Sequence, residues 1–98
     1  MVAITTTSTI TDTIPALGRK CIIVETPNTA DSGDTIEIVL STYGISTFLG
    51  IIGFEHTTEN SVVTTEAPTT AVSSGTLTIT IGGSSDDNEK RVYFIFGK

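Results

Sequence analysis

Apolar and polar residues alternate along much of the chain with a period of two. The clearest case is TLTITI, Thr76 to Ile81, in which leucine or isoleucine occupies every second position and threonine the others. Because successive side chains of a β-strand point to opposite faces of a sheet, this segment predicts a strand with one buried and one solvated face. DTIEIVLS, Asp34 to Ser41, alternates in the same way and predicts a second such strand.

Two further segments are apolar at consecutive positions. RKCIIVET, Arg19 to Thr26, and RVYFIFG, Arg91 to Gly97, place apolar side chains on both faces of a predicted strand. In a small sandwich each sheet has one solvated face, so these strands carry surplus apolar surface, which is typical of an interface. The alternative is that loops or the N-terminal segment cover it. The candidate interface residues are Ile22, Val24, Tyr93 and Ile95.

Turn-forming residues separate these strands. PNTADSG, Pro27 to Gly33, lies between the first of them and the strand that begins at Asp34. GGSSDDNEK, Gly82 to Lys90, lies between the last two. Proline, glycine, asparagine, aspartate and serine favour tight turns, so both segments are predicted to be hairpin loops.

The middle of the chain is less regular. Gly50 and Gly53 interrupt ISTFLGIIGFEH, Ile45 to His56, which predicts a long strand with a bulge or bend. SVVTTE, Ser61 to Glu66, predicts a short strand. APTTAVSSG, Ala67 to Gly75, predicts an edge loop, because its proline cannot donate a hydrogen bond to a sheet.

The composition indicates one all-β domain. Twenty threonines, thirteen isoleucines and seven valines make forty of the 98 residues β-branched, and such side chains favour strands. A chain of this length suffices for one core. We expect a single small β-sandwich or barrel, Ig-like or jelly-roll-like, of about seven mostly antiparallel strands. Residues 13–98 are expected to form this domain, and residues 1–12 an N-terminal arm or a first edge strand.

The charge distribution disfavours two classes of partner. The net charge is −6, with −3 on residues 1–49 and −3 on residues 50–98. An evenly acidic surface repels nucleic acid and anionic membranes. The N-terminus has neither a basic start nor an apolar core, so no signal peptide is predicted. The uncharged run from Ile38 to Phe54 is too short and too rich in glycine, serine and threonine to predict a membrane span.

Two acidic segments offer oxygen ligands for a cation. Asp31 and Asp34 lie in one, and Asp86 to Glu89 form the other. Their spacing matches no defined calcium loop, and Lys90 and Arg91 compete for the carboxylates of the second. We expect solvated loop tips with no metal and no cofactor, and a bound cation in either loop is the alternative.

Catalytic motifs are absent from the sequence. His56 is the only histidine and lies beside Glu55 and near Glu59, which makes it the one candidate general base. There is no nucleophile elbow, zinc-binding histidine pair or phosphate-binding glycine loop. Cys21 is the only cysteine; its apolar neighbours predict an inert thiol, and its lack of a pairing partner favours a reducing compartment. We therefore predict that the protein is not an enzyme.

The last third of the chain carries a family resemblance. EAPTTAVSSGT is followed by TLTITIGG, a polar loop and RVYFIFG, in a short, acidic chain rich in threonine and isoleucine. This style of sequence resembles the small virion proteins of tailed phages, in particular capsid decoration (cement) proteins. The resemblance implies a structural role in a virion assembled in the host cytoplasm, with symmetric docking on a capsid lattice as a trimer or other homo-oligomer. It implies no site residue, and an arm from Met1 to Asp12 would order on the capsid.

Two other functions remain open on the residues alone. One is a β-sandwich binding module of the carbohydrate or adhesion type, with or without calcium. The other is a small enzyme that uses His56 with Glu55 or Glu59.

Overall fold

The β-branched and alternating segments of the sequence form strands. The computed structural model describes residues 2–13, 18–58, 62–82 and 88–98. These residues contain eight strands and one 3-10 helical turn, and no helix among them is long and apolar enough to cross a membrane. The elements are β1 (Thr9–Asp12), β2 (Lys20–Glu25), β3 (Thr35–Val39), η1 (Leu40–Tyr43), β4 (Phe48–Thr58), β5 (Val62–Glu66), β6 (Thr69–Ser73), β7 (Thr76–Thr80) and β8 (Lys90–Gly97).

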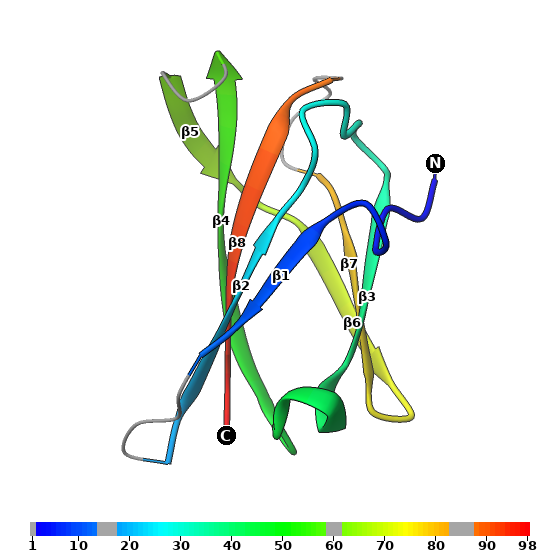
Figure 1. The fold of residues 1–98 in the computed structure, drawn as a ribbon, viewed down its shortest axis with the longest axis vertical. Coiled ribbons are helices and arrows are strands. Elements are labelled where there is room, and N and C mark those ends of the chain that lie inside the picture. Colours follow the sequence, from blue (N-terminus) through cyan, green and yellow to red (C-terminus); the bar gives the residue numbers. More distant parts are fainter. Residues whose placement is uncertain (1, 14–17, 59–61, 83–87) are drawn as a thin grey trace.

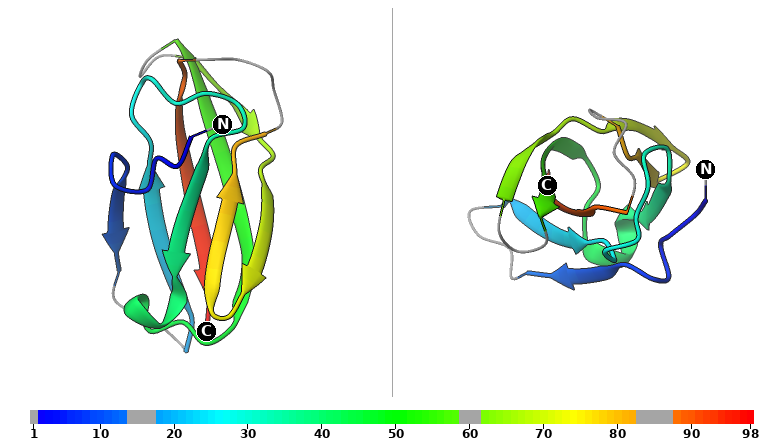
Figure 2. Two further views of the ribbon diagram at one scale, coloured as in Figure 1. Left: turned by 90° about the vertical axis from the view of Figure 1, so that its right-hand side faces the viewer. Right: turned by 90° about the horizontal axis from the view of Figure 1, so that it is seen from above.

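The strands form two sheets that face each other. One sheet has the order β1-β2-β8-β4-β5 and the other the order β3-β7-β6 (Figure 1). Every pair of neighbouring strands is antiparallel. Seen along the long axis, the strands surround a shared interior (Figure 2). The predicted all-β fold, a small sandwich of antiparallel strands, is confirmed.

The strand count exceeds the prediction because the segment predicted as an edge loop contains β6. Ser74 and Gly75 both have positive φ, of 52° and 80°. A two-residue turn with positive φ at both positions matches the twist of the flanking strands, so it joins β6 and β7 as a hairpin. β6 pairs with β7 along its whole length, from Thr69 opposite Thr80 to Ser73 opposite Thr76.

Both predicted hairpins are wrong. β2 lies in the five-stranded sheet and β3 in the three-stranded sheet, so the connection from Pro27 to Gly33 passes from one sheet to the other. β7 and β8 are likewise in different sheets. Turn-forming residues indicate where a strand ends, and they do not indicate which sheet the next strand joins. Segments of seven or nine residues are long enough to cross the spacing of about 10 Å between packed sheets.

β4 confirms the long, irregular strand predicted around two glycines. It extends over residues 48–58, and its pairing with β8 shifts register between Phe48 and Gly50. Leu49 is therefore the extra residue of a bulge, and its side chain is exposed. The uncharged run from Ile38 to Phe54 contains the end of β3, all of η1 and the first part of β4.

The N-terminal segment is paired within the chain. Ala3 forms a parallel bridge to Thr35 on β3, and the Ile4 amide donates to the Thr35 carbonyl at 2.8 Å. A few residues later β1 pairs with β2 in the other sheet. The first twelve residues therefore include the first edge strand, and their first part covers the edge of β3.

The core lies between the two sheets and is almost entirely aliphatic. Its residues come from β2, β3, β7 and β8, from η1, from the N-terminal segment and from the connections before β3, after η1 and after β7. They are Ile4, Ile22, Val24, Ala30, Ile36, Ile38, Leu40, Ile45, Leu77, Ile79, Ile81, Tyr93 and Ile95. The predicted alternation of Thr76–Ile81 is confirmed, because its leucine and isoleucines are buried and its threonines half-buried.

Gly53 tests how tightly β4 packs. A Cβ atom at Gly53 would lie 2.9 Å from the Glu66 carbonyl oxygen and from the Tyr93 ring, whereas a Cβ at Gly50 would meet nothing within 4 Å. We expect Gly53→Ala to lower the free energy of unfolding by about 1–3 kcal/mol, because backbone and a buried ring must shift. We expect the matched Gly50→Ala to raise it by about 0.5 kcal/mol through the unfolded state. Urea unfolding measures both, and equal midpoints would contradict the packing.

Candidate interaction face

The four candidate interface residues are core residues, which corrects their expected position. Ile22 and Val24 on β2, and Tyr93 and Ile95 on β8, are fully buried between the sheets. Their side chains hold the sheets together, and they offer no surface to a partner. The surplus apolar surface of β2 and β8 therefore belongs to the opposite face of the same strands.

That opposite face is apolar over three neighbouring strands, and we call it the outer face. Ile23 on β2, Phe94 on β8 and Ile52 on β4 lie opposite one another in a single row across the sheet. The rows on either side add further apolar side chains from the same strands. The outer face consists of Cys21, Ile23, Ile52, Phe54, Val92, Phe94 and Phe96.

The outer face is partly covered by its own side chains. Phe54 and Phe94 pack edge to face, with ring centroids 6.1 Å apart. Most members of the outer face are half-buried, and Ile52 is 49% exposed. Leu49, at the bulge of β4, adds a side chain that is 48% exposed. Solvent therefore reaches the apolar row at its β4 end, where Ile52 lies. At its centre the packing of Phe54 against Phe94 holds the aromatic side chains in place.

The charges near the outer face cancel. Lys90 and Glu25 form an ion pair of 3.7 Å, and both side chains are partly solvated, so the pair contributes little stability. Cys21 is a free cysteine at one end of this face, and burial raises the pKa of its thiol. A raised pKa keeps the thiol protonated at neutral pH, which is the inert state that the sequence predicts.

A polar cluster lies beneath the outer face, inside the sandwich. Arg91 is fully buried; its Nη1 donates to the Ala30 carbonyl at 2.7 Å and to the Glu89 carbonyl at 2.8 Å. Its Nη2 lies 3.5 Å from Oε2 of Glu55, which is 2% exposed. The arginine thus connects β4 and β8 to the loop before β3.

A second buried carboxylate belongs to the same region. Glu66 Oε2 accepts hydrogen bonds from the Tyr93 hydroxyl and from the Gly82 amide, each at 2.8 Å. Burial raises the pKa of the Tyr93 hydroxyl above its ordinary value, and the negative charge of Glu66 raises it further. The phenol therefore remains a proton donor to Glu66 across the neutral range. These contacts fasten the segment after β7 to the sheet.

Of the residues proposed for catalysis, His56 and Glu55 are not brought together. His56 and Glu55 are neighbours on β4, so their side chains point to opposite faces of the sheet. Glu55 faces inward and pairs with Arg91, while His56 shares the outward side with Phe54. Glu59 lies outside the described residues.

The first acidic loop uses its carboxylates as acceptors for backbone amides. Asp34 is buried, and its two oxygens accept from the amides of Val2 and Asp31. Asp31 in turn accepts from the amide of Asn88 at 2.8 Å. In the part of the chain that the structure describes, no group of three or more histidine, cysteine or acidic side chains could hold a metal. Asp86 and Asp87 of the second acidic segment lie outside the described residues.

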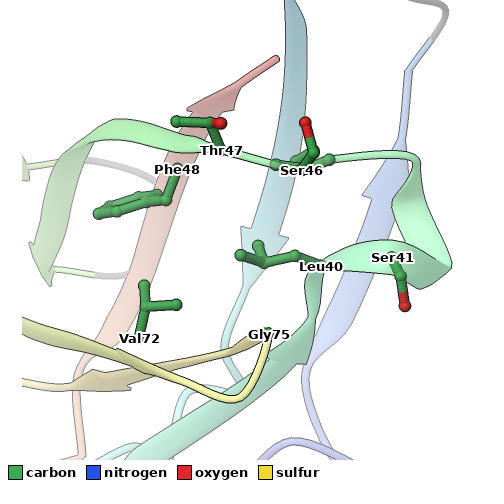
Figure 3. A pocket seen from close by; sticks show the side chains of 8 residues that line it. Leu40, Ser41, Ser46, Thr47, Phe48, Val72 and Gly75 are labelled. Atoms are coloured by element: carbon green, nitrogen blue, oxygen red, sulfur yellow. The ribbon is translucent and has the colours of Figure 1, made fainter.

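A cavity of about 550 Å³ opens beside β6, next to η1 and the start of β4. In Figure 3, Phe48 on β4 and Val72 on β6 approach it from opposite sides, and the Leu40 side chain points towards the space between them. The lining is mostly apolar and carries no charge. It consists of Leu40, Ser41, Ile45, Ser46, Thr47, Phe48, Val72 and Gly75.

Comparison with known proteins adds no relative: no family model, curated protein or solved structure matches the chain.

The sequence predicted surplus apolar surface on β2 and β8, and the structure places the accessible part of it on the side opposite the four named residues. The signal that distinguishes the sides is the position of charge and glycine. Arg91 and Glu55 share the inward side with Tyr93, and Gly53 lies opposite that tyrosine, where only a glycine leaves room for the ring.

Glu55 provides a test of the buried ion pair. We expect Glu55→Gln to lower the free energy of unfolding by about 3 kcal/mol, because Arg91 would keep a buried charge without its carboxylate partner. The neighbouring His56→Gln, on the opposite side of the same strand, should change it by less than about 0.5 kcal/mol. Urea unfolding at pH 7 measures both variants, and a similar loss in the two would contradict the inward orientation of Glu55.

Tyr93 provides a test of pH dependence. Its pKa in the folded state is raised above the ordinary value of 10.0, so the unfolded chain loses this proton first as pH increases. The stabilisation is complete below about pH 10 and is lost above it. Between pH 9 and pH 11 the wild type should lose about 1.4 kcal/mol more stability than Tyr93→Phe. If both proteins lost the same free energy of unfolding over this pH range, the Tyr93 hydroxyl would not be buried and bonded to Glu66 in the folded state.

Proposed function

We propose that this chain is a non-enzymatic structural or assembly protein, which docks through its outer face on the surface of an assembled protein particle such as a phage capsid. The outer face is the single observation that carries this proposal. Sandwich sheets commonly keep one face polar, and this sheet carries apolar side chains on both faces of β2, β8 and β4. An apolar sheet face with a neutral ion pair at its margin fits a protein partner.

The dimensions of the sheet suit such a contact. Five strands about 4.8 Å apart, with a central strand eight residues long, give a face of roughly 600 Å². A stable protein interface buries about 800 Å² on each partner. The whole outward side of this sheet, with the outer face at its centre, therefore approaches the area of a standard interface.

The virion setting and the oligomeric form are the finer parts of the proposal. They rest on the resemblance of the last third of the chain to capsid decoration proteins and on the net charge of −6, which disfavours nucleic acid and anionic membranes. In this setting the chain is made in the host cytoplasm and incorporated into the virion as a homo-oligomer, a trimer being one symmetric form.

A charge placed in the outer face tests the docking. Ile52→Lys puts an ammonium group in the apolar row, and Val39→Lys makes the same change at a strand residue of the other sheet that is equally exposed, at 50% against 49%. The assay is co-sedimentation of purified protein with assembled particles from its own source. We expect Ile52→Lys to weaken binding by at least about tenfold, since a buried unpaired charge is costly, and Val39→Lys to bind like the wild type.

Two results would contradict the proposal. Equal binding by Ile52→Lys and the wild type would remove the outer face as the docking surface. A wild-type chain that stays in the supernatant at all particle concentrations would remove the particle as the partner. The urea unfolding midpoints of both variants should match that of the wild type. This control shows that a change in binding is not caused by loss of folding.

A further inference from the structure

β6 is a bare strand edge. It is the last strand of the three-stranded sheet, and within the described residues its ladder partner is β7 alone. All five of its residues, Thr69–Ser73, are exposed, and none is charged. Natural sheets protect such edges with lysine, proline or a bulge, because unpaired amides and carbonyls bind other strands. β6 has none of these within its length, and Pro68 lies just before it.

The opposite edge of the same sheet is covered. The N-terminal segment lies along β3, where the Thr35 amide donates to the Val2 carbonyl at 2.9 Å and the Glu37 amide donates to Thr5 Oγ1 at 2.8 Å. The chain thus covers the β3 edge with its own residues and leaves the β6 edge open. The three-stranded sheet can extend at one side only.

The two sheets are also not joined by strand pairing beside β6, between β6 and the first half of β4. β5 pairs with β4 only from Gly53 onward, so among the described residues Phe48–Ile52 have a ladder partner only in β8. β5 then leads through residues 67–68 into β6 of the other sheet. The cavity of about 550 Å³ lies between the start of β4 and the end of β6, where Phe48 and Val72 line it (Figure 3). Val72 faces it and is 49% exposed.

We propose that the occupant of this edge is a second copy of the chain, with β6 paired to β6 in antiparallel orientation across a two-fold axis. The three strands of each copy would join into one continuous sheet. A strand added about 4.8 Å beyond β6 covers the opening between β6 and β4. With Ala71 opposite Ala71 of the second copy, Thr70 and Val72 of each copy face inward. Thr70 of one copy then lies opposite Val72 of the other, so each Thr70 reaches the mouth of the other copy's cavity.

Symmetry and charge favour a second copy. An antiparallel strand is its own complement under a two-fold rotation, so one sequence supplies both sides of the contact. The chain carries −6 overall, yet β6 and the cavity lining contain no charged residue. Two copies can therefore approach at this edge without bringing like charges into contact. This inference is independent of the docking through the outer face.

Ala71→Lys tests the pairing, because it places two ammonium groups opposite each other at the axis, where like charges destabilise a strand pair. Sedimentation equilibrium over micromolar to millimolar concentrations should show a monomer–dimer equilibrium for the wild type. Ala71→Lys should raise its dissociation constant by at least about tenfold. Val39→Lys, with the same charge on another exposed strand position, should leave the constant unchanged.

A cysteine at the same position gives a positive readout. In a Cys21→Ser background, Ala71→Cys should form a disulfide-linked dimer under mild oxidation, and Val39→Cys should stay monomeric. A wild type that is monomeric throughout the range, or a dimer that Ala71→Lys leaves intact, would overturn the proposal. A dimer dissociated by Ile52→Lys and not by Ala71→Lys would assign self-association to the outer face and would also overturn it.

Discussion

The pairing of Arg91 on β8 with Glu55 on β4 determines which face of the five-stranded sheet points inward. β2 and β8 are apolar on both faces, so burial of apolar area alone does not select one of them, and a slip of one residue would exchange the faces. Arg91 and Glu55 lie directly opposite each other in the ladder, and both are buried. With Arg91 inward, its guanidinium reaches the Ala30 carbonyl and its carboxylate partner at once. In some proteins a buried polar or ionic group contributes more to register than to stability, and the position of this pair fits that role.

The outer face follows from this choice of register. Because Tyr93 and Ile95 point into the core, Phe94 and the other members of the outer face lie on the opposite side of the sheet. No element of the described chain covers them there. The same chain covers the edge of β3 with its N-terminal segment and joins the two sheets again between β5 and β6. The described residues thus leave an apolar face on the five-stranded sheet and an uncharged edge on the three-stranded sheet accessible. We propose both as surfaces for protein contacts.

The sequence predicted the elements better than their arrangement. Alternation located β7 and β3, because a strand with one buried face carries its period in the residues themselves. It did not distinguish the sides of β2 and β8, where both sets of positions are apolar. The connections before β3 and β8 were predicted as hairpins because turn residues report local backbone geometry and not the sheet that follows. Ser74 and Gly75 could have revealed the β6–β7 hairpin, since a serine–glycine pair between two threonine-rich segments suits a two-residue turn.

The orientation of β2, β8 and β4 is the claim on which the outer face depends, and isoleucine methyl NMR with a soluble paramagnetic agent tests it most directly. The agent broadens the signals of methyl groups that solvent reaches. The structure predicts strong broadening for Ile52 and measurable broadening for Ile23, with sharp signals retained by Ile22 and Ile95. Broadening of Ile22 and Ile95 with protection of Ile23 and Ile52 would mean that the strands present the other face, and it would contradict the account.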